Sequence, residues 1–154
     1  MPATSTDRIE KQIVLDAPRS RVWRALTDVR QFNQWFGVNL EHPFKAGEKT
    51  SGRITIRGYE HILMEAWVEK IEPEHHFSFR WHPGSVEPNI DYSKEPTTLV
   101  AFTLEDDDDG TRLTVVETGF DALPESRRAK AFSGNESGWA GQLRNIANYL
   151  KANS

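Results

Sequence analysis

The stretch WAGQLRNIANYL, residues 139–150, decides the fold. Upstream of it, residues 133–136 (SGNE) fit a capping box, in which a serine and a glutamate satisfy free amides of a first helical turn. Together they predict a helix over residues 134–151, about 27 Å long at 1.5 Å per residue. The apolar residues of this helix recur at the spacing of one helical face: Trp139, Leu143, Ile146, Ala147 and Leu150. A helix of this length can cross a whole sheet and cover its apolar face.

Six segments before this helix have the alternation of β-strands. In residues 75–81, Phe77, Phe79 and Trp81 lie on one face, while serine and arginine lie on the other. The clearest hairpin joins residues 98–104 to residues 111–118 through an acidic connection that ends in glycine. The remaining strands are expected at residues 9–15, 51–57 and 61–71.

Two short helices are predicted between the first and second strands. Pro18 suits a first helical turn, because its missing N–H would be unpaired there. Asp28 can end the first helix and cap the second, and Gly37 stops the second. The loop over residues 83–96 contains three prolines and is longer than most connections, so we expect a movable rim there.

This order of elements predicts an α+β fold, in which a curved antiparallel sheet wraps around the long C-terminal helix. We expect one domain over residues 1–154, with residues 1–7 as a polar, disordered end. If the sheet curls strongly, the helix and the sheet cannot fill the space between them. The fold therefore predicts an internal apolar pocket.

Composition excludes several classes of site and partner. The 154 residues include no cysteine, which removes disulfides and thiolate metal sites. The net charge of −4 disfavours nucleic-acid binding. Neither a signal peptide nor an apolar run of membrane-spanning length is visible, so we expect a cytoplasmic protein that does not bind membranes. The histidine spacings and the acidic run at residues 105–110 lack metal-binding patterns, so no metal or cofactor is expected.

Glu117 is the candidate polar group of the pocket. It continues the face of Leu113 and Val115 on its strand, so a carboxylate would point at the concave side of the sheet. There it could act as a general base or accept a hydrogen bond from a ligand. The alternative, which we favour from the sequence, is a strand-end residue paired with an arginine near the rim. The candidate ligand-binding residues are Trp35, Phe44, Trp67, Phe79, Trp81, Glu117 and Trp139.

The sequence resembles the family named for the activator of the heat-shock-protein-90 ATPase, in the START-like, helix-grip (SRPBCC) superfamily. The likeness runs from about Ile9 to Leu150 and rests on several short matches: Ala17-Pro18, residues 22–28 (VWRALTD), Trp35-Phe36-Gly37, Ile71-Glu72-Pro73, Trp81, Thr98-Leu99-Val100 with Phe102, Gly110-Thr111-Arg112-Leu113, Gly119-Phe120 and Trp139. The resemblance implies a helix-grip fold with an internal pocket, of the stand-alone bacterial type. It implies no single activity.

Three functions follow as hypotheses. The first is binding of a small apolar or aromatic molecule between the sheet and the C-terminal helix. The second is a cyclase- or hydrolase-like enzyme that uses Glu117, His61 or Tyr59 in the same pocket. The third is a chaperone-related protein-interaction module, which would show an exposed apolar patch. A homodimer is compatible with all three.

Overall fold

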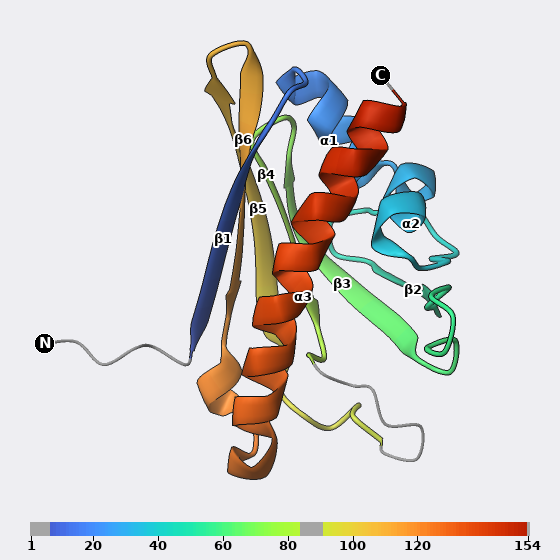
Figure 1. Cartoon of the computed structure of the whole chain (residues 1–154). Coiled ribbons are helices and arrows are strands. Elements are labelled where there is room, and N and C mark those ends of the chain that lie inside the picture. The colour runs from blue at the N-terminus through green and yellow to red at the C-terminus, as the bar shows by residue number, and fades with distance from the viewer. Residues whose placement is uncertain (1–6, 84–90, 154) are drawn as a thin grey trace, which may run out of the picture.

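The computed structural model describes residues 7–83 and 91–153 (Figure 1). The elements follow in the order β1 (Arg8–Leu15), α1 (Arg19–Thr27), α2 (Val29–Phe36), β2 (Lys49–Arg53), β3 (Leu63–Glu72), β4 (His76–Trp81), β5 (Thr98–Asp107), β6 (Gly110–Thr118), the short 3-10 helix η1 (Phe120–Ala122) and α3 (Glu125–Ala152). All strands join one six-stranded sheet in the order β1-β6-β5-β4-β3-β2. Every neighbouring pair is antiparallel, so the α+β helix-grip architecture is confirmed.

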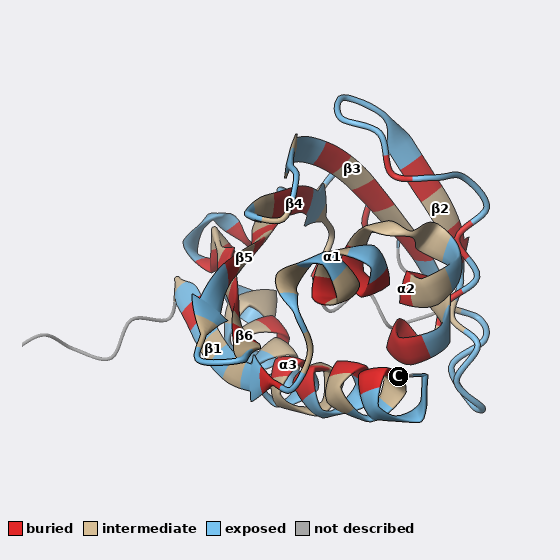
Figure 2. Cartoon of the chain, turned by 90° about the horizontal axis from the view of Figure 1, so that it is seen from above, coloured by how far each residue is buried: buried red, intermediate tan, exposed pale blue. Residues whose placement is uncertain are grey.

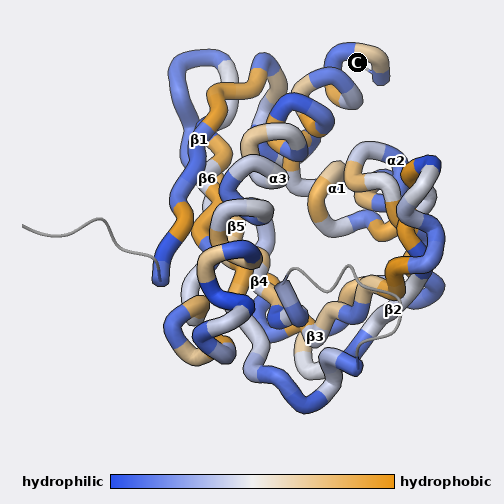
Figure 3. Tube along the Cα trace, turned by 60° about the horizontal axis from the view of Figure 1, so that its bottom comes forward, coloured by the Kyte–Doolittle hydropathy of each residue, from blue (hydrophilic) through white to orange (hydrophobic). Residues whose placement is uncertain are grey.

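The sheet curves, and its concave side holds the core. Seen from above, the arc runs from β1 round to β2, with α1 inside it and α3 along its open side (Figure 2). Hydrophobic and hydrophilic segments alternate along β1 and α3, as expected for elements that bury one face (Figure 3). Aromatic side chains of α2 and β4, among them Phe32, Phe77 and Phe79, are fully buried in this core.

The two short helices form where the sequence predicts them. Asp28 ends α1 and caps α2, since its side chain accepts a hydrogen bond from the backbone N–H of Arg30. Gly37 ends α2 with φ of 87°, a left-handed conformation that glycine adopts without strain. Farther on, Gly52 of β2 is required by close packing, because a Cβ there would lie 1.9 Å from the carbonyl oxygen of Asn39.

Helix α3 begins nine residues earlier than the sequence predicted, at Glu125 instead of Gly134. The prediction of a capping box at residues 133–136 is therefore wrong, because these residues lie inside the helix. The upstream turns form because Pro124 precedes a run of good helix formers, and because Phe132 packs on Phe120 with ring centroids 5.3 Å apart. At 1.5 Å per residue, the 28 residues span about 42 Å.

The acidic hairpin is tighter than expected. Strands β5 and β6 extend until Asp107 pairs with Gly110, which leaves a two-residue turn. The acidic side chains there find arginine partners: Asp107 pairs with Arg112 at 2.7 Å and Asp106 pairs with Arg19 at 2.9 Å.

The connection from β4 to β5 was expected to form a movable rim, and its residues 84–90 lie outside the described part. Its described end is attached to α3. The Arg127 guanidinium binds the Glu95 carboxylate and lies over the Tyr92 ring, 4.6 Å from its centroid. Within residues 7–83 and 91–153, no helix is both long and apolar enough to cross a membrane.

Candidate functional site

A pocket of about 110 Å³ opens beside the middle of α3. Its lining comes from the end of α2, the end of β4 and two turns of α3: Phe36, Trp81, Asn135, Gly138, Trp139 and Gln142. We call this the aromatic pocket. Residues 135, 138, 139 and 142 lie on one face of α3, because they are spaced three and four apart. The pocket is therefore built where this helical face meets the last residue of β4.

Glu117 lies behind the aromatic pocket and is fully buried. Its Oε1 accepts a hydrogen bond from the Trp139 indole N–H at 2.7 Å, and its Oε2 accepts one from the Trp81 indole N–H at 2.8 Å. The Thr98 hydroxyl donates to Oε2 at 2.5 Å, and the Asn135 amide nitrogen lies 3.0 and 3.1 Å from the two oxygens. Four uncharged donors therefore surround this carboxylate.

The strand register and the helix bring these donors to Glu117. Trp81 pairs with Thr98 across β4 and β5, and Glu117 pairs with Val100 across β5 and β6. Glu117 is thus one diagonal step from Thr98 on the same face of the sheet, which is within reach of a long side chain. Helix α3 then adds Trp139 above them.

Glu117 has no cationic partner in the described part of the chain, where no lysine, arginine or histidine comes within ion-pair distance of it. The expected pairing with a rim arginine is therefore wrong. Residues 84–90 (GSVEPNI) contain no lysine, arginine or histidine that could supply a counter-charge. Arg127, the arginine that opens α3, binds Glu95 instead.

Three aromatic rings form the wall of the pocket. The Phe36 ring centroid lies 6.1 Å from that of Trp81 and 6.2 Å from that of Trp139, and the two indoles are 5.7 Å apart. The rings are inclined to one another by 62°, 62° and 33°. Because both indole N–H groups are bound to Glu117, the orientation of these two rings is fixed from behind.

Two carboxamides supply the polar lining. Asn135 uses its amide nitrogen on Glu117, and Gln142 donates its own to the Phe36 carbonyl oxygen at 3.0 Å. The Gln142 carbonyl oxygen accepts a hydrogen bond from Asn145 at 3.0 Å. A carbonyl oxygen has two acceptor positions, so both of these lining carboxamides retain acceptor capacity. Gly138 leaves the mouth open, since a Cβ there would meet nothing within 4 Å.

The structure brings three of the seven candidate residues together: Trp81, Trp139 and Glu117. Phe79 lies beside Trp81 in the core, 5.5 Å between centroids, and Phe44 packs on Phe32 and Phe77. The Trp35 indole donates to the Ala25 carbonyl oxygen at 2.7 Å, inside the helical layer. Trp67 contacts His82 and the Lys49 ammonium away from the pocket. These four side chains do not line the aromatic pocket.

The two other groups considered for catalysis lie outside the pocket. Tyr59 is 53% exposed and His61 is exposed, both in the connection between β2 and β3. The expectation that they share a pocket with Glu117 is wrong, because the strand expected from residue 61 begins only at Leu63. No group of three or more potential metal ligands occurs within residues 7–83 and 91–153.

Sequence reasoning missed the remaining lining residues: Phe36, Asn135, Gly138 and Gln142. Asn135 and Gly138 were assigned to a helix start or left without a role. The helical spacing could have indicated the three α3 residues, because positions 135, 138 and 142 share a helical face with Trp139, which was predicted to bind the ligand. Phe36 carried no comparable signal.

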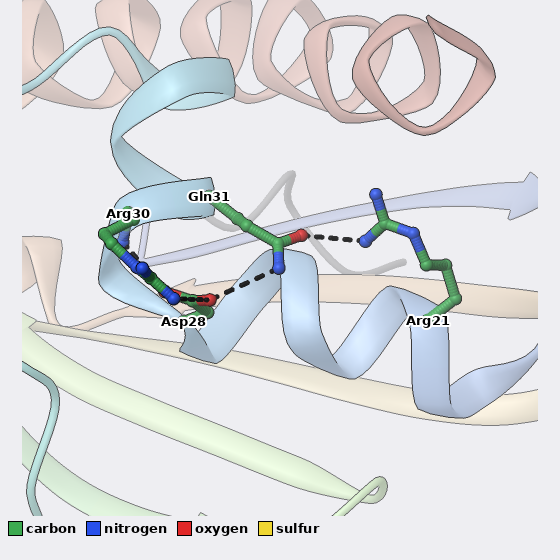
Figure 4. A network of polar contacts seen from close by, with 4 residues as sticks. All are labelled: Arg21, Asp28, Arg30 and Gln31. Carbon is green, nitrogen blue, oxygen red and sulfur yellow. Dashed lines mark hydrogen bonds and ion pairs between the residues drawn. The ribbon is translucent and has the colours of Figure 1, made fainter. Parts of the chain in front are cut away.

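A second, wider cleft of about 320 Å³ lies between α1, α2 and the end of α3. It is polar (Figure 4): Arg21 donates to Gln31 at 2.8 Å, and Gln31 donates to Asp28 at 3.3 Å. Burial acts to raise the pKa of the Asp28 carboxyl, but hydrogen bonds from Arg30 and Gln31 outweigh it and hold that pKa below its ordinary value. Arg30 pairs with Asp28, and Arg21 is bound by Gln31 and by the Asn153 carbonyl oxygen, so the polar groups of this cleft are engaged within the protein and it is the weaker candidate.

The fold and the pocket define a helix-grip domain, in which a curved sheet and a long helix enclose a small aromatic site. The family described as activator of Hsp90 ATPase homolog 1-like protein matches residues 16–151, and the chain belongs to this family.

Solved structures share the fold. DynU16, a protein assigned to the dynemicin biosynthetic locus, is 26% identical with a TM-score of 0.72; the match covers 96% of this chain and 48% of that one. This chain thus spans about half of DynU16. Protein MLL2253 from Mesorhizobium loti is 22% identical, with a TM-score of 0.75 and 96% and 98% of the two chains covered.

The Aha1 dimer from Colwellia psychrerythraea is 17% identical, with a TM-score of 0.68 and 93% and 95% of the two chains covered. No curated protein matches the chain.

Proposed function

We propose that this protein binds a small molecule in the aromatic pocket. The observation that carries the proposal is a pocket whose aromatic wall is held in place by a buried carboxylate that does not itself line it. Fixed aromatic walls with a few polar groups are typical of ligand sites. A buried indole N–H needs a hydrogen-bond acceptor, and here a single carboxylate supplies the acceptor for both rings.

The volume limits what can bind. Drug-sized ligands occupy pockets of about 300–1,000 Å³, whereas this pocket measures about 110 Å³. A cavity of about 150 Å³ accommodates benzene. The aromatic pocket therefore suits a very small molecule or one end of a larger molecule that extends past Gly138 into solvent.

Binding is better supported than catalysis. Glu117 accepts hydrogen bonds from four protein donors, so its oxygens are occupied and none faces the pocket. A general base must come within hydrogen-bond reach of the proton it removes. We therefore assign Glu117 a positioning role.

A protein-interaction role has one observation in its favour. Three of the four exposed large apolar side chains in the described residues cluster between residues 56 and 63: Ile56, Tyr59 and Leu63. They would suit a protein partner or a second copy of this chain. The similarity to a protein solved as a dimer agrees with a homodimer. This surface lies on the β2–β3 connection and leaves the aromatic pocket available.

Gly138→Leu tests the pocket, because the new side chain would occupy the mouth. We expect it to weaken binding of toluene, a benzene ring that carries one methyl group, by about tenfold or more. The measurement is a titration of the protein with toluene, followed by the indole N–H resonances of Trp81 and Trp139. Small molecules that co-purify with the wild-type protein, detected by native mass spectrometry, should be absent from the variant.

Gly134→Leu is the matched control. Gly134 lies one turn earlier on α3, and a Cβ there also meets nothing within 4 Å, but it does not line the pocket. Each substitution should stabilise the helix by about 1 kcal/mol, since glycine is a poor helix former. Equal toluene affinities in the two variants, with no co-purified molecule in the wild type, would refute the proposed function.

A further inference from the structure

We infer that the ligand of the aromatic pocket is a small organic cation, such as a methylated ammonium group. This inference rests on the proposed function and adds the charge of the ligand. It depends on three features of the site: an uncompensated buried carboxylate, aromatic rings between that carboxylate and the pocket, and polar lining groups with free acceptor positions.

The first feature is the charge of Glu117. An indole N–H can only donate, and one such group faces each carboxylate oxygen, which matches the ionised, acceptor-only form of glutamate. Hydrogen bonds from neutral donors disperse this charge but do not cancel it. A buried charge is normally paired, because leaving it unpaired in a low-dielectric interior is costly. A cation in the adjacent pocket would supply the missing countercharge.

The second feature is the aromatic wall. Cations are attracted to the π faces of aromatic rings, most strongly to tryptophan, and cages of several rings recognise quaternary ammonium groups. Phe36, Trp81 and Trp139 provide three such rings around one pocket. The two indoles each donate their N–H to Glu117, which increases the electron density of two rings that line the pocket.

The third feature is the set of polar groups. Asn135 turns its amide nitrogen toward Glu117 and Gln142 turns its own toward the Phe36 carbonyl. The Asn135 carbonyl oxygen, and the acceptor position of the Gln142 carbonyl oxygen that Asn145 does not use, are left to interact with a ligand. Oxygen acceptors favour a ligand that is positive or donates hydrogen bonds. Among the described residues, no arginine, lysine or histidine lines the pocket, so these lining residues do not favour an anion.

Two probes of equal shape separate charge from size. Choline carries a positively charged trimethylammonium group where 3,3-dimethylbutan-1-ol carries a neutral tert-butyl group. We expect the wild-type protein to bind choline about tenfold more tightly than the alcohol, as judged by the indole N–H resonances of Trp81 and Trp139. The Gly138→Leu variant should bind neither probe, which places binding in the aromatic pocket.

Glu117→Gln tests the source of the preference. The amide keeps the shape and removes the charge, so choline should lose most of its advantage, while the affinity for the alcohol changes by about twofold or less. Because this variant carries a risk of misfolding, the wild-type chain labelled with 5-fluorotryptophan serves as a second measurement. Fluorine withdraws electrons from the ring face, so labelling should weaken choline binding and spare the alcohol.

The outcomes separate this inference from the proposed function. Equal affinities for the two probes, or a preference for the alcohol, would overturn the inference that the ligand is a cation. The proposed function would then stand with a neutral ligand in the same pocket. An unchanged choline preference in the fluorinated protein would also overturn the inference of a cation. Absence of binding by choline, the alcohol and toluene alike, with no co-purified molecule, would remove the proposed function itself.

Discussion

Asp28 performs two tasks at the junction of α1 and α2. Its carboxylate accepts the N–H of Arg30 at 3.0 Å, which satisfies a free amide at the start of α2. It also accepts a hydrogen bond from Gln31, so it holds one end of the network drawn in Figure 4. Because α2 carries Phe36 into the aromatic pocket, this cap helps to position the wall of the site.

Asp28→Ala should cost about 1 kcal/mol of unfolding free energy at pH 7, the usual effect of losing a helix cap. The pKa of Asp28 is lowered in the folded protein, so its contribution is present above the unfolded pKa of about 3.9 and is lost as pH falls through the folded value. Urea denaturation at pH 7, 5 and 3 should show a constant difference from wild type at pH 7 and 5 and a smaller one at pH 3.

The control for this substitution is Glu136→Ala, which removes an exposed carboxylate from α3. Its effect should stay within about 0.5 kcal/mol at every pH. A difference between wild type and Asp28→Ala that stayed constant down to pH 3 would show that the carboxylate charge is not involved.

At the scale of elements, α3 closes the fold with one buried stripe. Trp139, Leu143, Ile146 and Leu150 are at most 6% exposed, as their helical spacing predicted. The helix contacts α2, β1, η1 and α1, so it joins parts of the chain that the sheet alone would leave separate.

Leu143→Ala should lower the unfolding free energy by about 2–5 kcal/mol, because it leaves a cavity in a packed core. The neighbouring Arg144→Ala substitution, on the exposed face, should change it by about 0.5 kcal/mol or less. Thermal and urea unfolding of the two variants give the comparison. Similar losses for both would mean that the stripe does not hold the helix to the sheet.

The periodicity of apolar residues made much of the fold and part of the site predictable from the sequence. Alternation in residues 75–81 and 111–118 placed Trp81 and Glu117 on the concave face, and helical spacing placed Trp139 opposite them. The start of α3 was missed because a capping motif inside the helix matched the pattern as well as the true start did. Local pattern cannot decide between two such starts when packing of Phe132 on Phe120 selects the earlier one.

The partners of Glu117 could not be read from the sequence. They come from β4, β5 and two turns of α3, up to 36 positions away along the chain. Their meeting depends on strand register and on the curvature of the sheet, neither of which leaves a local signature. For a carboxylate, an arginine partner was the simpler expectation. Only the folded structure shows that two indole N–H groups bind Glu117.

At the scale of the molecule, the chain forms one core. Buried side chains from every strand except β2, and from α1, α2 and α3, belong to a single apolar cluster. The sheet is continuous from β1 to β2, and α3 contacts both β1 and α2. This continuity favours a single folding unit over residues 7–83 and 91–153.

We therefore expect a single cooperative unfolding transition. Tryptophan fluorescence reports on the indoles, while far-ultraviolet circular dichroism reports mainly on the helices, so the two probes observe different parts of the molecule. Their urea curves should coincide, as they do for most single domains of this size. Separated midpoints would contradict this expectation and show that the helices and the surroundings of the indoles are lost in different steps.

Glu117 also bears on the order of assembly. Its donors belong to β4, β5 and α3, so the carboxylate is satisfied only when two neighbouring strands and the helix have all arrived. A partly assembled chain that had formed the sheet without docking α3 would lack two of the four partners of this carboxylate, and water would have to replace them. A helix docked out of place would cover the charge without supplying those hydrogen bonds, which is costly because a buried charge is then left unsatisfied. The carboxylate therefore penalises half-formed states, and the helix and the sheet reach their final arrangement together.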